Sequence, residues 1–534
     1  MRAHKFTIYF GMILLLIVIF AVFQDYGIST DEDRRSEYGK AIYNYFATGF
    51  ADETAQNMGY ASYYGGAADL LGEVVTRLFP FSPHESRHLL WALFGFCGIC
   101  GVYKLATIFI SDQQIRPCAG IFAALIIILT PGYFGSIFIN PKDIPFATCY
   151  IWSLYLYLKL LQALPEIKPK AVILFGLVTG LALGIRVVGA FLILPYVLGV
   201  LFWCFTLETK VRQKYGLSSV LIHVLLYLIL PAVTVAYLTM IFAWPWAHSA
   251  PLTNPITALM EFSDYTAWKK TTLLDGEFYA ADQIPRYYLL QYLLIQLPEL
   301  FLAASMTGLI QGLILLYRKE YKSMSLIAVI VAVIAGFGPV IISLIKGSTI
   351  YSGYRQFIFS VLILAALSGA SSAYFIFKLK QTGKMFLYRV TLLSVTVLAL
   401  QVGIKIIKLH PYQYSYYNNF VGGIAGAYRR FELDYWALSY REAAQGILAH
   451  MPQHLSGASK INVLVCDSRH SIIPFLDERF AIVKKPNHAH FVVRRHRKNC
   501  PMNRKWQLIH RTVREGVPLS EVYLTSLGQQ IITQ

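Results

Sequence analysis

Three consecutive acidic residues, Asp31, Glu32 and Asp33, come directly after the first long apolar run of the chain. Ser29 or Thr30 can cap a helix whose first turn holds these acids, because carboxylates near a helix N-terminus suit the helix dipole. One interpretation is therefore a capped amphipathic helix lying on a membrane surface. The other is chemical, since a carboxylate in this position can accept the proton of an attacking hydroxyl group.

A further candidate carboxylate, Asp143, lies between two prolines in the stretch FINPKDIPFA at residues 138–147. Taken alone, Asn140 or Asp143 is best interpreted as the N-cap of the apolar helix that follows. Close to another carboxylate at a membrane surface, Asp143 could instead bind a proton or a divalent cation. We therefore treat Asp31 and Asp143 as potential ligands of a divalent cation, and the metal itself stays open.

Basic side chains accompany these acids. Arg186 and Arg355 each lie at the end of an apolar run. A guanidinium donates two parallel hydrogen bonds to a phosphate, so both are candidates for holding a lipid-linked phosphate. Snorkelling of the side chain toward lipid headgroups is the alternative explanation. A long polar loop at residues 244–289 adds three more candidate donors, Lys269, Lys270 and Arg286.

The elements that position these residues are predicted to be membrane-spanning helices. The chain has 534 residues, 56% of them hydrophobic and 14% charged, and its mean hydropathy is +0.51. A soluble protein would have about a quarter charged residues, and a span needs about 18 apolar ones. We predict about eleven spans, at residues 6–23, 88–110, 118–133, 144–163, 171–185, 187–206, 217–243, 290–316, 324–345, 356–377 and 386–406.

Lysine and arginine are concentrated in alternate short loops, on the same side as the N-terminus. The positive-inside rule then places the N-terminus in the cytoplasm and residues 407–534 in the periplasm, together with the polar loops 24–87 and 244–289. All candidate site residues lie on that outer face. The net charge of +18 lies mostly in loops and the tail, so we expect membrane lipids as partners and no nucleic acid.

Residues 407–534 form a second, polar region after a membrane domain of residues 1–406. The segment DYWALSYREAAQGILAHM has helical periodicity, and INVLVC, FAIVKK, HFVVRR and EVYLT are typical of strands. We predict a small α/β domain whose excess of basic residues either faces water or attracts anionic headgroups. Cys466 and Cys500 could form a disulfide there.

Across essentially its whole length the sequence resembles the C-type membrane glycosyltransferases, in the branch of the protein O-mannosyltransferases, the lipid A aminoarabinose transferases and the Rgt-type sugar transferases. The resemblance rests on five motifs, namely TDE at 30–32, NPKDIPFA, PRYYLL, YRQFIF and HPYQYSYYNNFVGG…FELDYWALSYREA at 410–443. It implies a mostly α polytopic fold in the inner membrane of a Gram-negative-type cell.

The resemblance also implies transfer of a sugar from a polyprenyl phosphate to a glycan, lipid or protein acceptor, in one inverting displacement. Asp31 matches the catalytic carboxylate of the family, Glu32 lies beside it, and Asp143 matches an assisting acid. Some members use a divalent cation. A lipid flippase or transporter and a non-catalytic scaffold are the alternatives, but the charges gather at one surface and we find no internal repeat, which favours surface chemistry.

Overall fold

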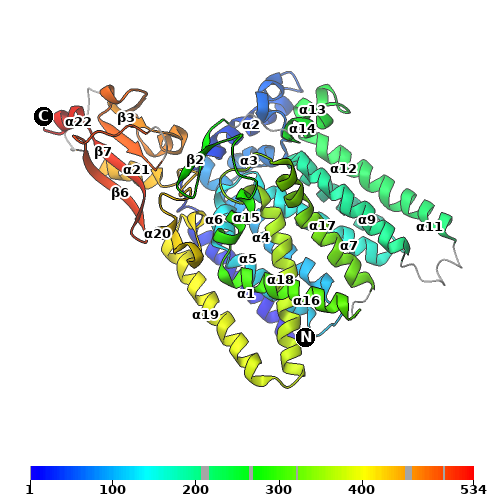
Figure 1. The fold of residues 1–534 in the computed structure, drawn as a ribbon. Coiled ribbons are helices and arrows are strands. Elements are labelled where there is room, and N and C mark those ends of the chain that lie inside the picture. Colours follow the sequence, from blue (N-terminus) through cyan, green and yellow to red (C-terminus); the bar gives the residue numbers. More distant parts are fainter. Residues whose placement is uncertain are drawn as a thin grey trace.

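The computed structural model describes residues 2–205, 216–263, 269–319, 323–451, 460–496 and 500–533. Long helices form one bundle, and a small sheet lies beyond one end of it (Figure 1). In the described part, eight helical segments are long and apolar enough to cross a membrane: α4 (Pro83–Phe109), α7 (Asp143–Ala163), η3 with α9 (Val187–Phe205), α11 to α12 (Ser218–Phe242), α16 (Glu299–Tyr317), α17 (Met324–Lys346), η5 with α18 (Arg355–Gln381) and α19 (Met385–Leu409).

Shorter or broken helices account for the other three predicted spans. Helices α1 (Arg2–Val22) and α8 (Pro169–Ile185) are apolar, but their apolar stretches, Thr7–Val22 and Pro169–Ile185, are shorter than those of the other eight. The predicted span 118–133 is not one straight helix, because α5 (Arg116–Ile128) and α6 (Pro131–Ile139) are bent by 72°. Pro131 explains the break, since proline has no N–H for the preceding turn but is well suited to start a helix.

The predicted span 290–316 also differs from the structure. A short helix, α15 (Tyr288–Gln296), ends before Pro298, and α16 begins at Glu299. Helix α18 lies inside the bundle against α4, α5, α7, α16 and α17, whereas α19 lies at the edge and is exposed along most of its length. The close approach of α18 to α5 depends on Gly369, where an added Cβ would lie 2.3 Å from the Ala123 Cα.

The polar loops share one end of the bundle with the C-terminal sheet (Figure 1). This arrangement agrees with the prediction that three polar regions lie on the same face. The elements there are α2 (Thr30–Ala47), η1 (Glu53–Asn57), η2 (Gly59–Ala61), α3 (Ala67–Leu78), α13 (Pro245–Ser249), α14 (Asn254–Ser263) and the hairpin of β1 (Thr271–Leu274) and β2 (Glu277–Ala280).

The C-terminal sheet has the strand order β4-β3-β5-β7-β6. Strand β3 pairs in parallel with β4 and β5, while β7 is antiparallel to β5 and β6. Helix α21 (Tyr440–Ala449) packs on the sheet, and Cys466 and Cys500 form a disulfide. The strands are β3 (Ile461–Val465), β4 (Phe480–Val483), β5 (Phe491–Arg494), β6 (Gln507–Arg514) and β7 (Val517–Leu524). The α/β prediction is confirmed, with β6 as an addition.

Candidate active site

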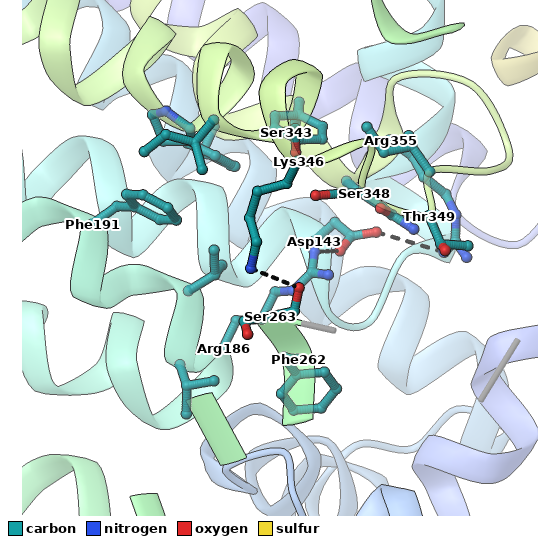
Figure 2. Close-up of a pocket in the computed structure, with 18 of the residues that line it drawn as sticks. Asp143, Arg186, Phe191, Phe262, Ser263, Ser343, Lys346, Ser348, Thr349 and Arg355 are labelled. Carbon is teal, nitrogen blue, oxygen red and sulfur yellow. Dashed lines mark hydrogen bonds and ion pairs between the residues drawn. The ribbon is translucent and has the colours of Figure 1, made fainter. Parts of the chain in front are cut away.

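A cavity of about 280 Å³ lies where α7, η3 (Val187–Leu192), α14, α17 and η5 (Arg355–Phe357) meet. Cationic and apolar side chains both line it, and Figure 2 shows Lys346 extending toward Ser263. The charged and polar lining includes Tyr64, Lys142, Asp143, Arg186, Lys346 and Arg355. The apolar lining includes Val187, Val188, Phe191, Leu259, Phe262, Pro339 and Ile342.

Asp143 lies at the first residue of α7 and its side chain is 2% exposed. Oδ1 of Asn140 accepts the backbone N–H of Asp143 at 2.8 Å, so Asn140, and not the Asp143 side chain, stabilises the turn that leads into α7. The Asp143 carboxylate is left to pair with Arg186, and its other oxygen lies 3.6 Å from Nη1 of Arg355. The second oxygen also accepts the Asn140 amide at 3.0 Å. Asp143 therefore holds two arginines at the cavity wall.

Asp31 reaches the same group from the first turn of α2. Nη1 of Arg355 donates to Oδ2 of Asp31 at 2.6 Å, and the Asp31 side chain is 31% exposed. The guanidinium of Arg355 lies 5.2 Å from the Trp436 ring and 5.4 Å from the Tyr351 ring, which hold it in place. The structure thus brings Asp31, Asp143, Arg186 and Arg355 together, although they are far apart in the sequence.

The environment of Asp31 sets its protonation state. Burial by itself would raise the pKa of Asp31, but the charges of Arg355 and Lys142 and the hydrogen bond from Arg355 outweigh it and hold the pKa well below its ordinary value. Asp31 is therefore a carboxylate throughout the neutral and mildly acidic range. Because a third of its surface is still open, it can meet an approaching hydroxyl group.

Glu32 faces a different direction, because consecutive residues of a helix point about 100° apart. Its Oε1 accepts the Ser29 N–H at 2.8 Å, and its Oε2 lies 2.9 Å from Nε2 of His88. The Glu32 side chain is 1% exposed and does not line the cavity. The structure therefore places Glu32 in the capping box of α2 and not beside Asp31 in the site.

Asp31 is not itself a lining residue and reaches the cavity through Arg355, and three other predicted site residues also lie outside the lining. Lys269, Lys270 and Arg286 are exposed, and none of them lines the cavity. Arg286 lies against Gly347, where an added Cβ would be 3.5 Å from its Nε.

Two cations and a tyrosine of the cavity were not among the residues predicted from the sequence, namely Lys142, Lys346 and Tyr64. Lys142 precedes Asp143 directly, and Lys346 ends an apolar run as Arg186 does. Both signals were present in the sequence.

The donor groups do not fit a tight divalent-cation site. Across the described ranges, no three His, Cys, Asp or Glu side chains come together as metal ligands. Asp31 and Asp143 are bridged by Arg355, which stands where a shared cation would lie. Calcium and magnesium prefer several oxygen ligands and no neighbouring cation. The expected divalent cation stays a prediction.

The C-terminal region contacts the first turn of α2, which carries Asp31. The Trp436 carbonyl accepts the backbone N–H of Thr30 at 3.2 Å, and the Ser468 hydroxyl lies 2.9 Å from the Thr30 hydroxyl. His470 lies 3.0 Å from the Asp33 carboxylate. Ser468 has a φ of +51°, a strained value for a serine. The tail therefore contacts both sides of the Asp31 turn.

The fold and part of the sequence match known proteins. A model of the family described as dolichyl-phosphate-mannose-protein mannosyltransferase matches residues 68–243, about a third of the chain. This stretch includes Asp143 and Arg186. None of the curated proteins compared with the chain matches it.

The apo crystal structure of ArnT from Cupriavidus metallidurans aligns over 98% of both chains, with 14% identity and a TM-score of 0.50. The chain has the C-type glycosyltransferase fold. ArnT bound to undecaprenyl phosphate aligns with a TM-score of 0.48, at 14% identity, over 96% of this chain and 97% of that one. The oligosaccharyltransferase AglB from Archaeoglobus fulgidus, in complex with an inhibitory peptide and a dolichol-phosphate, gives 0.44 at 14% identity, over 90% of this chain and 65% of that one.

Proposed function

We propose that the protein is a membrane glycosyltransferase that moves a sugar from a polyprenyl phosphate to an acceptor outside the cytoplasm. The C-type fold and the family match at residues 68–243 support this activity. The observation that carries the proposal is the Asp31–Arg355–Asp143 cluster beside a cavity lined by both cationic and apolar side chains.

The two kinds of wall suit the two ends of such a donor. Aliphatic and aromatic side chains, among them Val188, Phe191 and Ile342, provide a surface for isoprenoid units. Arg186 and Arg355 also line the cavity and supply positive charge for a phosphate. Both arginines are paired with carboxylates, so their donors are held rigidly before a substrate arrives.

In the proposed reaction the acceptor oxygen attacks C1 of the sugar while the bond from C1 to the phosphate oxygen breaks. The acceptor proton passes to Asp31, and the polyprenyl phosphate leaves with the electron pair of the broken bond. Asp31 is a weak base, because Arg355 stabilises its charged form. A weak base suits a late proton transfer, since the hydroxyl proton becomes acidic once its oxygen has begun to bond to C1.

Mass spectrometry of envelope glycans and glycolipids tests the proposal directly. Cells lacking the protein should lose one sugar mass, and wild-type protein should restore it while Asp31→Asn should not. Immunoblotting of the membrane fraction checks that both proteins are equally abundant. An unchanged glycan and glycolipid profile in the deletion strain would contradict the proposed activity.

The competing flippase activity has its own measurement. In vesicles reconstituted with the protein, a flippase would equilibrate a labelled lipid-linked sugar between the leaflets without any acceptor. We expect no such flux, because the paired charges lie at one end of the bundle, while flipping needs a polar path across it.

A further inference from the structure

One cation of the cavity differs from the other three. Arg186 and Arg355 are paired with carboxylates, and the Lys346 ammonium donates to the Ser263 carbonyl at 3.4 Å. Lys142 also lines the cavity, yet within the described ranges its ammonium makes no ion pair and no hydrogen bond. Its charge acts on the carboxylates of Asp31 and Asp69, but in the described part of the chain neither forms an ion pair with it. A half-buried ammonium whose N–H donors have no acceptor marks a place where an anionic ligand can bind.

The Lys142 ammonium lies over the ring of Tyr64, with Nζ 4.4 Å from the ring centroid. Arg35 lies 5.0 Å from the centroid of the same ring, and its own charge is balanced by Asp69. Tyr64 lines the cavity and packs against Phe262, with 4.4 Å between the ring centroids. An aromatic ring is a favourable seat for an ammonium group and leaves its three N–H donors available.

The backbone around Tyr64 is fixed. Its carbonyl accepts the Tyr38 hydroxyl at 3.0 Å. The next residue, Gly65, touches α8 so closely that an added Cβ would lie 1.7 Å from the Gly184 carbonyl oxygen. No larger residue fits there without moving the helix. The platform for Lys142 is therefore rigid.

The local potential favours an anion. Burial would raise the pKa of Tyr64, but the charges of Lys142, Arg186 and Arg35 more than offset it, and the pKa lies below its ordinary value. The charge of Lys142 also helps to lower the pKa of Asp31. Lys142 is therefore close enough to act on both the cavity and the proposed base.

We propose that Lys142, seated on Tyr64, binds the phosphate of the donor and neutralises the charge that this phosphate gains when it leaves. This inference rests on the proposed function. The donor is a phosphodiester with one negative charge, and the departing polyprenyl phosphate is a monoester with nearly two. The proton taken by Asp31 neutralises that carboxylate, so Arg355 becomes available to the phosphate as its charge grows. Lys142 thus binds the negative charge that the donor phosphate already has, and Arg355 binds the charge that the phosphate gains when it leaves.

The test measures binding of a short-chain polyprenyl phosphate to detergent-purified full-length protein, which requires no knowledge of the sugar. Lys142→Met should weaken binding at least about tenfold, the usual effect of losing a charge-assisted hydrogen bond. Lys142→Arg keeps the charge and should recover much of the loss. The matched control is Lys159→Met, which removes the same charge from an exposed position on α7, the helix that Lys142 precedes, and should bind like wild type.

Tyr64 is a positioning residue, and a double-mutant cycle tests it. Tyr64→Leu should weaken binding several-fold in the wild-type background and have no further effect in the Lys142→Met background. Tyr64→Phe keeps the ring and should bind nearly normally. A purely structural role for Tyr64 would give additive losses instead.

Size-exclusion profiles and melting temperatures establish that each variant is folded, and Lys142→Gln replaces Lys142→Met if that variant is not. If wild type binds and the folded Lys142 variant binds within twofold of it, the inference about Lys142 is wrong while the proposed function stands. If wild type itself does not bind polyprenyl phosphate, the proposed function and the inference both fail.

Discussion

Asp31 and Glu32 are neighbours in the sequence, but the structure predicts opposite consequences when each is changed to its amide. Asp31→Asn removes the proposed base. General base catalysis contributes about 10²- to 10⁴-fold, so the transfer rate should fall by that factor. The folded state should change little, because the Asp31 side chain is 31% exposed and Arg355 keeps Asp143 at 3.6 Å.

Glu32→Gln should have the reverse effect. Both Glu32 oxygens are buried and engaged, at 2.8 Å to the Ser29 N–H and 2.9 Å to His88. The amide can keep only one of its two groups as an acceptor, so the variant loses about 1–3 kcal/mol of folding free energy. The transfer rate per folded molecule should stay within about tenfold of wild type, since the Glu32 carboxylate is 1% exposed and is engaged by Ser29 and His88, not by Arg355.

The assay measures two quantities on the same preparations. Thermal unfolding in detergent gives the stability, and transfer of label from a lipid-linked donor in native membranes gives the rate, normalised to the monodisperse fraction. The reasoning is refuted if Glu32→Gln loses as much turnover per folded molecule as Asp31→Asn, because a buried capping residue has no access to the acceptor. Full turnover by Asp31→Asn would equally remove it as the base.

Three more outcomes are expected. In Arg355→Gln, the charge of Lys142 is the main one left to oppose the effect of burial, so the pKa of Asp31 rises. In a pH–rate profile, the activity of this variant should be lost at a higher pH than that of wild type. The wild-type rate should stay flat down to the ordinary carboxyl range. Cys466→Ser removes a disulfide between residues 34 positions apart and should lower the melting temperature. A reducing agent should lower the melting temperature of wild type but leave that of the variant unchanged. EDTA should leave transfer by purified protein largely intact, because Arg355 occupies the place between the two carboxylates; loss of transfer that Mg²⁺ restores would contradict this assignment.

Hydropathy located the long helices of the bundle, because a bilayer demands long apolar segments whatever their partners are. It could not show the bend between α5 and α6 or the break before α16, where Pro131 and Pro298 interrupt apolar runs that look continuous. Strand β6 was missed because its sequence QLIHRTVR mixes exposed polar residues into an edge strand without regular alternation.

The site was predictable where residue type restricts function. Carboxylates and arginines at the ends of apolar runs are unusual, and this singled out Asp31, Asp143, Arg186 and Arg355. The partner of each charged side chain could not be predicted in the same way, because it depends on contacts between segments that are distant in the sequence. Glu32 was therefore predicted to support Asp31 in the site, and Lys142, whose ammonium rests on Tyr64, was not among the predicted site residues.

The contacts of Thr30 with Trp436 and Ser468 join the beginning of the chain to its last quarter. Thr30 is synthesised more than 400 residues before Ser468, so most of the chain has been translated before Trp436 and Ser468 are available to contact the acidic turn. A nascent chain then has the helices and the cavity but an uncovered first loop. A nonsense mutation as late as residue 430 would leave every proposed substrate-binding cation in place and still remove the Trp436 ring that holds Arg355.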